Sequence, residues 1–438
     1  MRIAWFIPRY HPAIGGAEAF ARAMVRRFVE RGHAVDVFTT DAEELWYFTD
    51  RRRKRLDEPA GEWIDGAFVR RLPIQHIPLR KYVTRLLALS PRWSARCRWA
   101  PYMPIVPGLD TIKGEYDLVF GVGFPFTTFS HAAWRTARAA RAPLILTPFL
   151  HLSTPGDRVH RAYTQPHQVR LLAEADLIVS PTDLEANAIA EWGIARSRVL
   201  KLPMAIEPAD VTGGDRIRLR ERLHIDTQAF VVGQLGALHP NKGTHDLVRA
   251  LRQLNQSRPP TAPVHLMLAG ATSPEWEAYS ATIPAEAHRW LHWLGKLPQE
   301  ELPHYYAALD LFAMPSRTDS FGIVFLEAWA NALPVVAAAA GGVVEVVEHG
   351  KTGLLVTFGD CDAIASAIDR LVTDRALARR FGAAGRALVD HGFTWDDRFQ
   401  KLLGRVEMLV ASRPGRSGGT HRPHWRATSG RRATFRTK

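Results

Sequence analysis

Short apolar runs alternate with helix-length amphipathic stretches through most of the chain. The pattern opens with an apolar run at residues 3–8, an amphipathic stretch at 17–30 and a second apolar run at 34–39. A short apolar run is typical of a buried strand, whereas apolar residues spaced three to four apart are typical of a helix face. The opening therefore predicts a strand, helix, strand unit.

The same pattern continues in two series, separated at residues 203–215 by proline, glycine and polar residues. Runs that are apolar throughout indicate strands of a parallel sheet covered by helices on both faces. We therefore predict an α/β protein with two doubly wound, Rossmann-like domains facing an inter-domain cleft that holds the ligand. The expected strands are residues 117–121, 144–148, 176–180 and 199–203, then 230–235, 265–269, 292–294, 311–314 and 334–337.

The expected boundaries are a first domain at residues 1–205, a second at 206–388, a C-terminal helix at 389–410 that packs back on the first domain, and a disordered basic tail at 411–438. The length of 438 residues, 46% of them apolar, is ample for two cores. The two cysteines, Cys97 and Cys361, are too few for a disulfide framework or a cysteine zinc site. We expect a cytoplasmic protein, since no secretory signal or membrane span is recognisable in the sequence.

The net charge of +13 is concentrated in two segments. Residues 411–438 hold seven arginines, one lysine and no acid, and residues 51–100 carry a surplus of nine positive charges. The remainder sums to about −4, so the body of the chain is not basic. Without a base-reading module these charges do not predict a nucleic-acid partner.

The internal basic segment mixes cations with aromatic and aliphatic side chains. The run Arg51 to Arg55 is followed, between residues 70 and 102, by further cations interleaved with Tyr82, Leu86, Leu87, Trp93, Trp99 and Tyr102. This mixture suits an anionic membrane surface, and we predict peripheral membrane binding. A packed helical hairpin with a solvated face would give the same pattern.

Gly15 and Gly16 follow the first expected strand and open a helix. At this edge of a parallel sheet, helix N-termini point N–H groups at anions, and glycines let a phosphate or a sugar approach the backbone. We predict a donor-binding role for the pair. A tight turn without a ligand is the alternative, because a full dinucleotide-binding signature is missing.

A more specific pattern spans residues 315–328, between an expected strand and an expected helix. Asp319 falls in the loop at the mouth of the helix and Glu327 one to two turns inside, so both carboxylates can face one pocket. Two carboxylates for sugar hydroxyls and a positive helix end for a diphosphate are what a nucleotide sugar requires. The N–H groups at the helix start come from Ser320, Phe321, Gly322 and Ile323.

The alternative makes Asp319 a helix cap and Glu327 a solvated side chain. The apolar neighbours of Glu327, which are Phe325, Leu326 and Ala328, argue against simple exposure.

Several motifs follow one another in a fixed order between residue 1 and about residue 408. They are Gly15-Gly16-Ala17-Glu18, Lys242-Gly243, the 319–328 segment, Pro334-Val335-Val336-Ala337, Gly341-Gly342-Val343-Val344-Glu345, and residues 350–356. With these motifs the sequence resembles glycosyltransferase family 4, the retaining, group 1 nucleotide-sugar transferases of GT-B fold. The resemblance implies that Glu327 binds the nucleotide ribose and that Asp319, in place of the usual glutamate, lies by the transferred sugar.

One departure from the family pattern concerns the clamp for the leaving diphosphate. The family usually has an arginine shortly before its Lys-Gly pair, and Ala237 stands at that position here. Lys242 remains, and its ammonium can neutralise developing phosphate charge as the glycosidic bond breaks. An ordinary surface lysine is the alternative. His239 would add charge only if protonated.

His151 resembles the family's active-site histidine, which follows a central strand of the first domain. The commonest spacing would put that histidine at Phe149, two positions earlier. We predict a role for His151 near the donor sugar or the acceptor. For Glu345 we predict a cap on the following helix ahead of a role in ordering the donor loop.

Asp360-Cys361-Asp362 imitates the D-x-D metal motif of the other main transferase fold. Asp360 is placed to cap a helix, and no apolar strand leads into the motif. No other spacing suggests a dedicated metal site. We therefore expect no metal site and no cofactor beyond a UDP- or GDP-linked sugar.

Taken together, the resemblance implies a hexosyltransferase that takes its donor on the second domain and its acceptor on the first. The acceptor expected from the basic segment is lipid-linked or a polysaccharide, in cell-envelope or exopolysaccharide synthesis at the inner face of the plasma membrane. A catalytically silent nucleotide-sugar-binding partner subunit is the alternative, because of Ala237.

Overall fold

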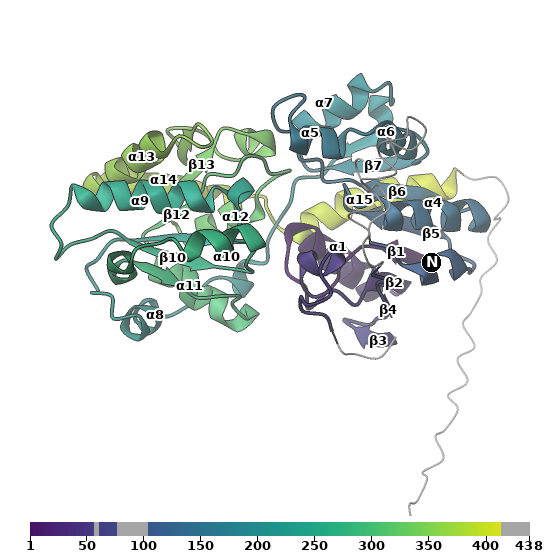
Figure 1. Cartoon of the computed structure of the whole chain (residues 1–438). Coiled ribbons are helices and arrows are strands. Elements are labelled where there is room, and N and C mark those ends of the chain that lie inside the picture. The colour runs from purple at the N-terminus through teal and green to yellow at the C-terminus, as the bar shows by residue number, and fades with distance from the viewer. Residues whose placement is uncertain (57–60, 77–103, 413–438) are drawn as a thin grey trace, which may run out of the picture.

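A computed structural model of the chain describes residues 1–56, 61–76 and 104–412. Two lobes lie side by side, each built round one sheet (Figure 1). The predicted tail beyond Ser412 and the stretch 77–103 of the basic segment, with its aromatic residues and Cys97, lie outside the described residues.

The first lobe contains an eight-stranded sheet in the order β3-β4-β2-β1-β5-β6-β7-β8. All neighbouring strands are parallel except the edge pair β3 and β4, which is antiparallel. Its strands are β1 (Arg2–Phe6), β2 (Ala34–Thr40), β3 (Gly61–Ile64), β4 (Ala67–Leu72), β5 (Leu118–Val122), β6 (Leu144–Thr147), β7 (Leu177–Ser180) and β8 (Val199–Lys201). Its helices are α1 (Gly16–Glu30), α4 (Thr128–Ala140), α5 (Arg158–Tyr163), α6 (Pro166–Ala173) and α7 (Asp183–Glu191), with short 3-10 turns at Leu45–Phe48, Pro107–Thr111 and Arg196–Arg198.

The second lobe contains a six-stranded, fully parallel sheet in the order β11-β10-β9-β12-β13-β14. Its strands are β9 (Val231–Leu235), β10 (His265–Ala269), β11 (Leu291–Trp293), β12 (Leu311–Met314), β13 (Val335–Ala338) and β14 (Gly353–Val356). Its helices are α8 (Arg216–Arg222), α9 (Thr244–Gln256), α10 (Pro274–Ser280), α11 (Leu302–Ala308), α12 (Ile323–Ala330), α13 (Cys361–Thr373) and α14 (Arg375–Asp390). Short 3-10 turns lie at Pro208–Asp210, Pro240–Lys242, Ala285–Arg289, Gln299–Glu301 and Gly341–Glu345.

Each predicted strand is present, with ends shifted by at most two residues. The structure adds β3, β4 and β14, which the pattern did not predict. β3 and β4 form an edge hairpin whose residues are mostly half-exposed and include three charged side chains, so they lack the uninterrupted apolar run of the central strands. The expectation of a parallel sheet was therefore incomplete at this edge.

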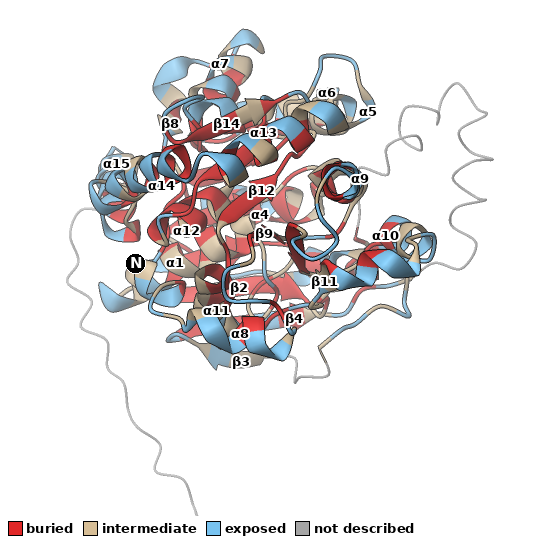
Figure 2. Cartoon of the chain, turned by 90° about the vertical axis from the view of Figure 1, so that its left-hand side faces the viewer, coloured by how far each residue is buried: buried red, intermediate tan, exposed pale blue. Residues whose placement is uncertain are grey.

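The cores lie between the sheets and their helices, where the central strands are buried along most of their length (Figure 2). The last helix, α15 (Trp395–Ala411), returns from the second lobe to α1 of the first (Figure 1). There the Phe399 ring meets Phe28 edge-on at 4.9 Å between centroids, and Trp395 meets Phe20 at 6.2 Å. Each buried aromatic ring stabilises this junction by a few kcal/mol.

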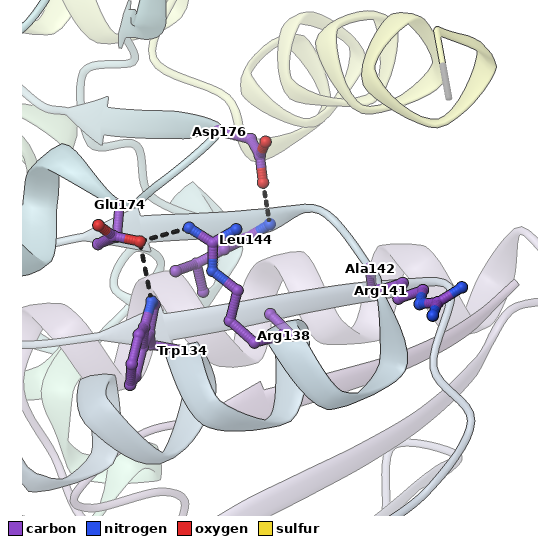
Figure 3. A pocket seen from close by; sticks show the side chains of 8 residues that line it. Trp134, Arg138, Arg141, Ala142, Leu144, Glu174 and Asp176 are labelled. Carbon is purple, nitrogen blue, oxygen red and sulfur yellow. Dashed lines mark hydrogen bonds and ion pairs between the residues drawn. The ribbon is translucent and has the colours of Figure 1, made fainter. Parts of the chain in front are cut away.

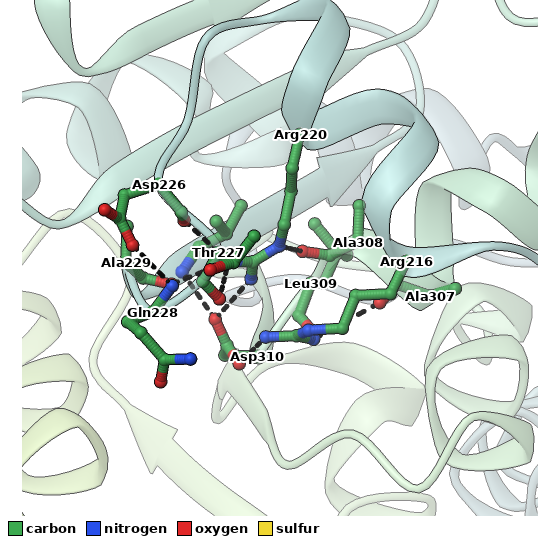
Figure 4. Close-up of polar contacts among 11 residues, drawn as sticks. Arg216, Arg220, Asp226, Thr227, Gln228, Ala229, Ala307, Ala308, Leu309 and Asp310 are labelled. Carbon is green, nitrogen blue, oxygen red and sulfur yellow. Dashed lines mark hydrogen bonds and ion pairs between the residues drawn. The ribbon is translucent and has the colours of Figure 1, made fainter.

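A buried ion pair fixes α8 to the start of β12 (Figure 4). The Arg220 guanidinium is fully buried and donates to Asp310 at 2.8 Å. Asp310 also accepts from Arg216 at 2.7 Å and from the Val231 amide at 2.8 Å. The remaining Arg220 donors reach the carbonyl oxygens of Ala308, Asp226, Thr227 and Ala229. This network fixes the amino-terminal ends of the central strands β9 and β12, whose carboxyl ends lead to the site.

Candidate functional site

The predicted donor residues of the two lobes face each other. Gly15 and Gly16 open α1 in the first lobe, and Ile323 begins α12 in the second. A methyl group placed on Gly16 would come within 3.9 Å of the Ile323 side chain. Because the first amides of each helix have no partner within their own helix, both N-termini present N–H groups at this junction.

Asp319 and Lys242 meet within the second lobe. The Asp319 side chain is only 6% exposed, and its Oδ1 pairs with the Lys242 ammonium. Its Oδ2 is buried without a hydrogen-bond partner in the part of the chain that the structure describes. Burial is the largest influence and would raise the pKa of Asp319, but the Lys242 ammonium, together with smaller contributions that include His151, holds this pKa below its usual value. The site therefore keeps an ionised carboxylate with one buried oxygen available.

Two loops of the second lobe are joined where they carry this ion pair. The Arg317 amide donates to the Asn241 carbonyl at 2.8 Å, and Gln234 donates to the Lys242 carbonyl at 2.8 Å. Gly243 has a φ of 69°, and a Cβ on it would lie 2.2 Å from the Pro315 carbonyl oxygen. Glycine after Lys242 is therefore required by both conformation and space.

His151 reaches the same ion pair from the first lobe. Burial lowers the pKa of His151 to about 4, although the Asp319 carboxylate opposes the shift, and the Lys242 ammonium adds to it. The imidazole is therefore neutral near pH 7. Its ring lies 4.9 Å from the Tyr163 ring, a neighbour that sequence reasoning did not single out. The structure thus brings Asp319, Lys242 and His151 close enough to interact electrostatically, while their roles stay predictions.

Phe149 explains why the histidine stands two residues later than the common spacing. Phe149 is 7% exposed, has a φ of 53° and packs edge-on against Phe20 at 5.5 Å. Its ring packs among buried apolar residues. The left-handed turn at Phe149 leads the chain to His151, whose imidazole interacts with Asp319 and Lys242 of the second lobe.

Glu327 has a different environment from Asp319. It lies in the second turn of α12 and accepts a hydrogen bond from the fully buried Tyr306 hydroxyl at 2.6 Å. Burial raises the pKa of Glu327, and the Asp210 carboxylate adds to the shift. The alternative of a simply solvated Glu327 is therefore excluded. Sequence reasoning missed Tyr306 because no short spacing connects α11 with α12.

The position of the missing clamp arginine is exposed. Ala237 lies in the loop after β9. His239 does not supply the missing charge, since burial lowers its pKa and its Nδ1 accepts from the Asn241 amide at 2.9 Å. Its ring instead stacks on Trp46 of the first lobe, 5.7 Å between centroids.

Ion pairs also join the lobes around the site. Lys296 of the second lobe reaches Glu43 of the first at 2.6 Å, and Arg53 reaches Glu277 with contacts of 2.7 and 3.0 Å. Arg53 belongs to the basic run predicted to meet a membrane. In the structure this member of the run contacts the other lobe, while Arg52 is 85% exposed.

The prediction that Glu345 caps the helix after it was wrong. Its carboxylate crosses to the first lobe and accepts from the amides of Asp183 at 2.8 Å and Leu184 at 2.5 Å, the first two residues of α7. Lys201 lies 3.3 Å from the same carboxylate. The Glu345 carboxylate thus binds the N-terminus of a helix 161 to 162 residues away in the sequence, which the packing of the two lobes brings near.

The rejection of Asp360-Cys361-Asp362 as a metal motif agrees with the contacts of its acids. Asp360 caps α13 by accepting from the Ala363 amide at 2.9 Å, and Asp362 accepts from Gln253 at 2.8 Å. Within residues 1–56, 61–76 and 104–412, no group of three or more His, Cys, Asp or Glu side chains is arranged to hold a metal ion. Metal independence itself stays a prediction.

A hollow of about 190 Å³ on the first lobe lies apart from these residues (Figure 3). It is lined by Trp134 and Arg138 of α4, and Asp176 and Leu144 close it at the amino ends of β7 and β6. Ligands of doubly wound sheets bind at the opposite, carboxyl ends of strands. This hollow is therefore not the site.

Comparisons with known proteins bear on the whole arrangement. The family model "Glycosyl transferase 4-like domain" matches residues 15–205, and "Glycosyl transferases group 1" matches residues 215–388. D-inositol 3-phosphate glycosyltransferase of Stackebrandtia nassauensis is 29% identical over 93% of this chain and 90% of its own length. A GDP-mannose-dependent alpha-(1-6)-phosphatidylinositol monomannoside mannosyltransferase of Mycolicibacterium smegmatis is 36% identical over 46% of this chain and 53% of its own length.

Solved structures share the fold. Sucrose-phosphate synthase of Thermosynechococcus elongatus superposes with a TM-score of 0.72 at 22% identity, covering 94% of this chain and 100% of that protein. HepE of Anabaena, in complex with UDP-glucose, superposes with a TM-score of 0.67 at 21% identity, covering 93% and 100%. The architecture is thus the predicted GT-B fold. With both lobes matched by family models, the chain belongs to the group 1 glycosyltransferases of family 4 and is a transferase that uses a nucleotide-sugar donor.

Proposed function

We propose that this chain is a retaining hexosyltransferase that moves a sugar from a UDP- or GDP-linked donor to a lipid-linked or glycan acceptor of the cell envelope. The observation that carries the proposal is the meeting of Lys242 and Asp319 of the second lobe with His151 of the first. Such a site can bind a charged donor on one lobe and an acceptor on the other.

In this proposal the donor's diphosphate lies against Lys242 and the N-terminus of α12. These groups stabilise the charge that develops when the bond between the anomeric carbon and the phosphate oxygen breaks. Glu327 accepts hydrogen bonds from the ribose hydroxyls, held in place by Tyr306. The free oxygen of Asp319 binds a hydroxyl of the transferred sugar, and neutral His151 hydrogen-bonds to the sugar or acceptor.

The acceptor hydroxyl then attacks the same face of the anomeric carbon that the diphosphate leaves and gives its proton to the departing phosphate oxygen, so configuration is retained. Retention is tested by NMR of the product's anomeric carbon. An inverted product would overturn the stereochemical assignment without removing the transferase.

The printed name of one relative supports a lipid-linked acceptor, since that protein acts with phosphatidylinositol monomannoside. The relative that covers more of the chain is named for D-inositol 3-phosphate, which shares the inositol phosphate group but carries no lipid. On this chain, Trp63 of the edge strand β3 is 68% exposed, and Arg70 lies over the neighbouring Phe68 ring at 5.4 Å. An exposed tryptophan beside a cation is suited to a lipid headgroup region. None of the described helices is long and apolar enough to cross a bilayer.

Peripheral membrane binding is tested by sedimentation with vesicles of phosphatidylglycerol and phosphatidylcholine at low salt. We expect the wild type to sediment and Trp63→Ser to sediment less, with Trp293→Ser, 51% exposed on the second lobe, as the matched control. Failure of the wild type to sediment would contradict membrane binding and leave the transfer reaction untouched.

The donor proposal is tested by binding and slow hydrolysis of UDP-, GDP- and ADP-sugars without added metal. Wild type is compared with Asp319→Ala, Glu327→Ala and Lys242→Ala. Selective turnover lost in these variants would establish the donor, and no binding to any nucleotide sugar would contradict the proposal.

A silent donor-binding subunit is the second candidate, and the exposed Ala237 favours it because one clamp charge is missing. Donor binding without hydrolysis or transfer to any acceptor would support this candidate. Restoring the charge with Ala237→Arg should then raise turnover.

A further inference from the structure

The first turn of α7 lies behind the loop that carries His151. Glu185, the third residue of α7, is 1% exposed, and its Oε2 accepts from the Leu150 amide at 3.1 Å. Leu150 directly precedes His151 in the chain. One buried carboxyl therefore fixes the backbone next to the imidazole.

The loop needs such a restraint because its backbone is strained. Phe149 has a φ of 53°, in the left-handed region that a phenylalanine rarely adopts. A strained residue persists only where its surroundings hold it, and such residues cluster at functional sites. The Phe149 ring is held by Phe20, and the following amide is held by Glu185.

The Glu185 side chain is not needed to cap α7. Thr182 already caps this helix, since its side chain accepts from the Glu185 amide at 3.3 Å. The two amides before it are bound by Glu345. The Glu185 carboxyl is thus left for the His151 loop.

The Glu185 carboxyl also has an unusual pKa and an unpaired oxygen. Burial raises the pKa of Glu185 well above its ordinary value, which favours the neutral form of this carboxyl. Its Oε1 has no hydrogen-bond partner among the residues described. A buried carboxyl oxygen without a hydrogen bond lowers the free energy of unfolding. The presence of such an oxygen on Glu185 therefore points to a role other than stabilising the fold.

We propose that Glu185 is a positioning residue that holds the Leu150 amide and thereby sets the His151 imidazole against Asp319 and Lys242. The inference rests on the proposed role of His151 and adds a residue that never touches the substrate. Because glutamine has the same shape and keeps an oxygen acceptor, Glu185→Gln should preserve the arrangement. Glu185→Leu removes the acceptor and leaves the Leu150 amide buried and unpaired.

The test follows His151 directly, by NMR of the full chain labelled with 13C at histidine Cε1. His151→Gln assigns the resonance. We expect Glu185→Leu to shift it and to move its titration midpoint from about 4 toward 6.5. Donor turnover should fall about tenfold to a hundredfold, with the KM for the donor changed less than about threefold. Glu185→Gln should stay within about threefold of wild type in turnover.

Ile189→Ala is the matched control, because Ile189 is fully buried on the same helix and makes no bond to the loop. It should lower thermal stability without moving the His151 resonance. If Glu185→Leu leaves resonance and turnover like those of Ile189→Ala, the inference is overturned. If Glu185→Leu does not fold, Glu185→Met removes the same acceptor with an unbranched chain and is interpreted in the same way.

Failure of the proposed function is distinguishable from failure of the inference. A wild type without turnover on any nucleotide sugar would contradict the proposed reaction. The NMR comparison needs no substrate, so it still decides whether Glu185 positions His151.

Discussion

At the residue scale, the site combines an ionised carboxylate with a neutral imidazole. Asp319 is held ionised by Lys242, whereas burial keeps His151 neutral. A neutral imidazole beside an ion pair can donate or accept a hydrogen bond without adding charge to a site that must bind a diphosphate. The assignment of roles thus follows from the environment of each group and not from its type alone.

The state of His151 predicts a pH dependence of stability. The pKa of about 4 in the folded chain lies below the ordinary 6.5, so between these values the unfolded chain binds a proton that the folded chain does not. The free energy of unfolding should therefore fall as the pH drops from 6.5 to 4, by up to about 3 kcal/mol from this group. Urea unfolding across this range measures the slope.

His151→Gln should flatten that slope. His167, whose pKa is also lowered to about 4 by burial, serves as the comparison: His167→Gln should flatten the slope similarly but leave donor hydrolysis intact. An unchanged slope in His151→Gln would show that the imidazole is not buried as described.

Arg220 gives a prediction of a different kind. Arg220→Met would leave Asp310 without its buried partner and would remove a donor from four carbonyl oxygens, of which that of Asp226 keeps the Ala229 amide. Breaking a buried ion pair on one side costs about 3–5 kcal/mol of the free energy of unfolding. Urea unfolding followed by tryptophan fluorescence measures the loss.

Arg218→Met is the control, because the Arg218 side chain is 50% exposed and pairs with Glu301. This variant should lower the free energy of unfolding by less than about 1 kcal/mol. Equal losses in the two variants would contradict the account.

At the element scale, the start of α12 is both the proposed binding surface for the donor and a place where the backbone requires glycine. Gly322 caps this helix with a φ of 90°, and a Cβ there would lie 2.7 Å from the Phe325 ring. Gly322→Ala should therefore lower the free energy of unfolding by about 1–3 kcal/mol and weaken binding of UDP or GDP, because the donor amides shift. Thermal unfolding and nucleotide titration measure the two effects.

Gly156→Ala separates the two causes. Gly156 has a similar φ of 82° but open space around the Cβ position. It should show a smaller loss of stability and unchanged nucleotide binding. Unchanged nucleotide binding in Gly322→Ala would mean that the start of α12 does not contact the donor.

At the scale of the whole molecule, the lobes are joined by side chains that cross between them. Glu345 binds two amides of α7, and Lys296 binds Glu43. Closing two lobes round a reaction excludes water and completes the site. Separation of the lobes would break these contacts, so they favour the arrangement in which the lobes meet.

Glu345→Ala should shift the balance toward an open state, in which the lobes separate. Loss of a helix cap is worth about 1 kcal/mol, which changes the ratio of the two states about fivefold. We expect a larger radius of gyration by small-angle X-ray scattering and a higher KM for the donor. Glu348→Ala, with an exposed side chain paired to Lys351, is the control and should change neither. A radius of gyration equal to wild type in Glu345→Ala would contradict a closing role.

The sequence by itself determined the alternation of strands and helices, the two sheets, and the placement of Lys242, Asp319 and Glu327 on loops and helix starts at one edge. These features depend on local periodicity and on the geometry of parallel sheets, which act over short stretches of chain. The same reasoning failed at β3 and β4, because short strands with mixed polarity leave no periodic signal, and at β14, whose apolar run is only four residues long.

Only the tertiary structure decided which side chains meet. Glu345 caps α7 rather than its own neighbour, Phe149 turns into the core so that His151 faces the second lobe, and Tyr306 and Glu185 hold groups far from them in sequence. Each of these depends on how helices pack on sheets and how one lobe docks on the other. Such packing depends on the shapes and burial of side chains from the whole chain, so the spacing of residues within one segment does not predict it.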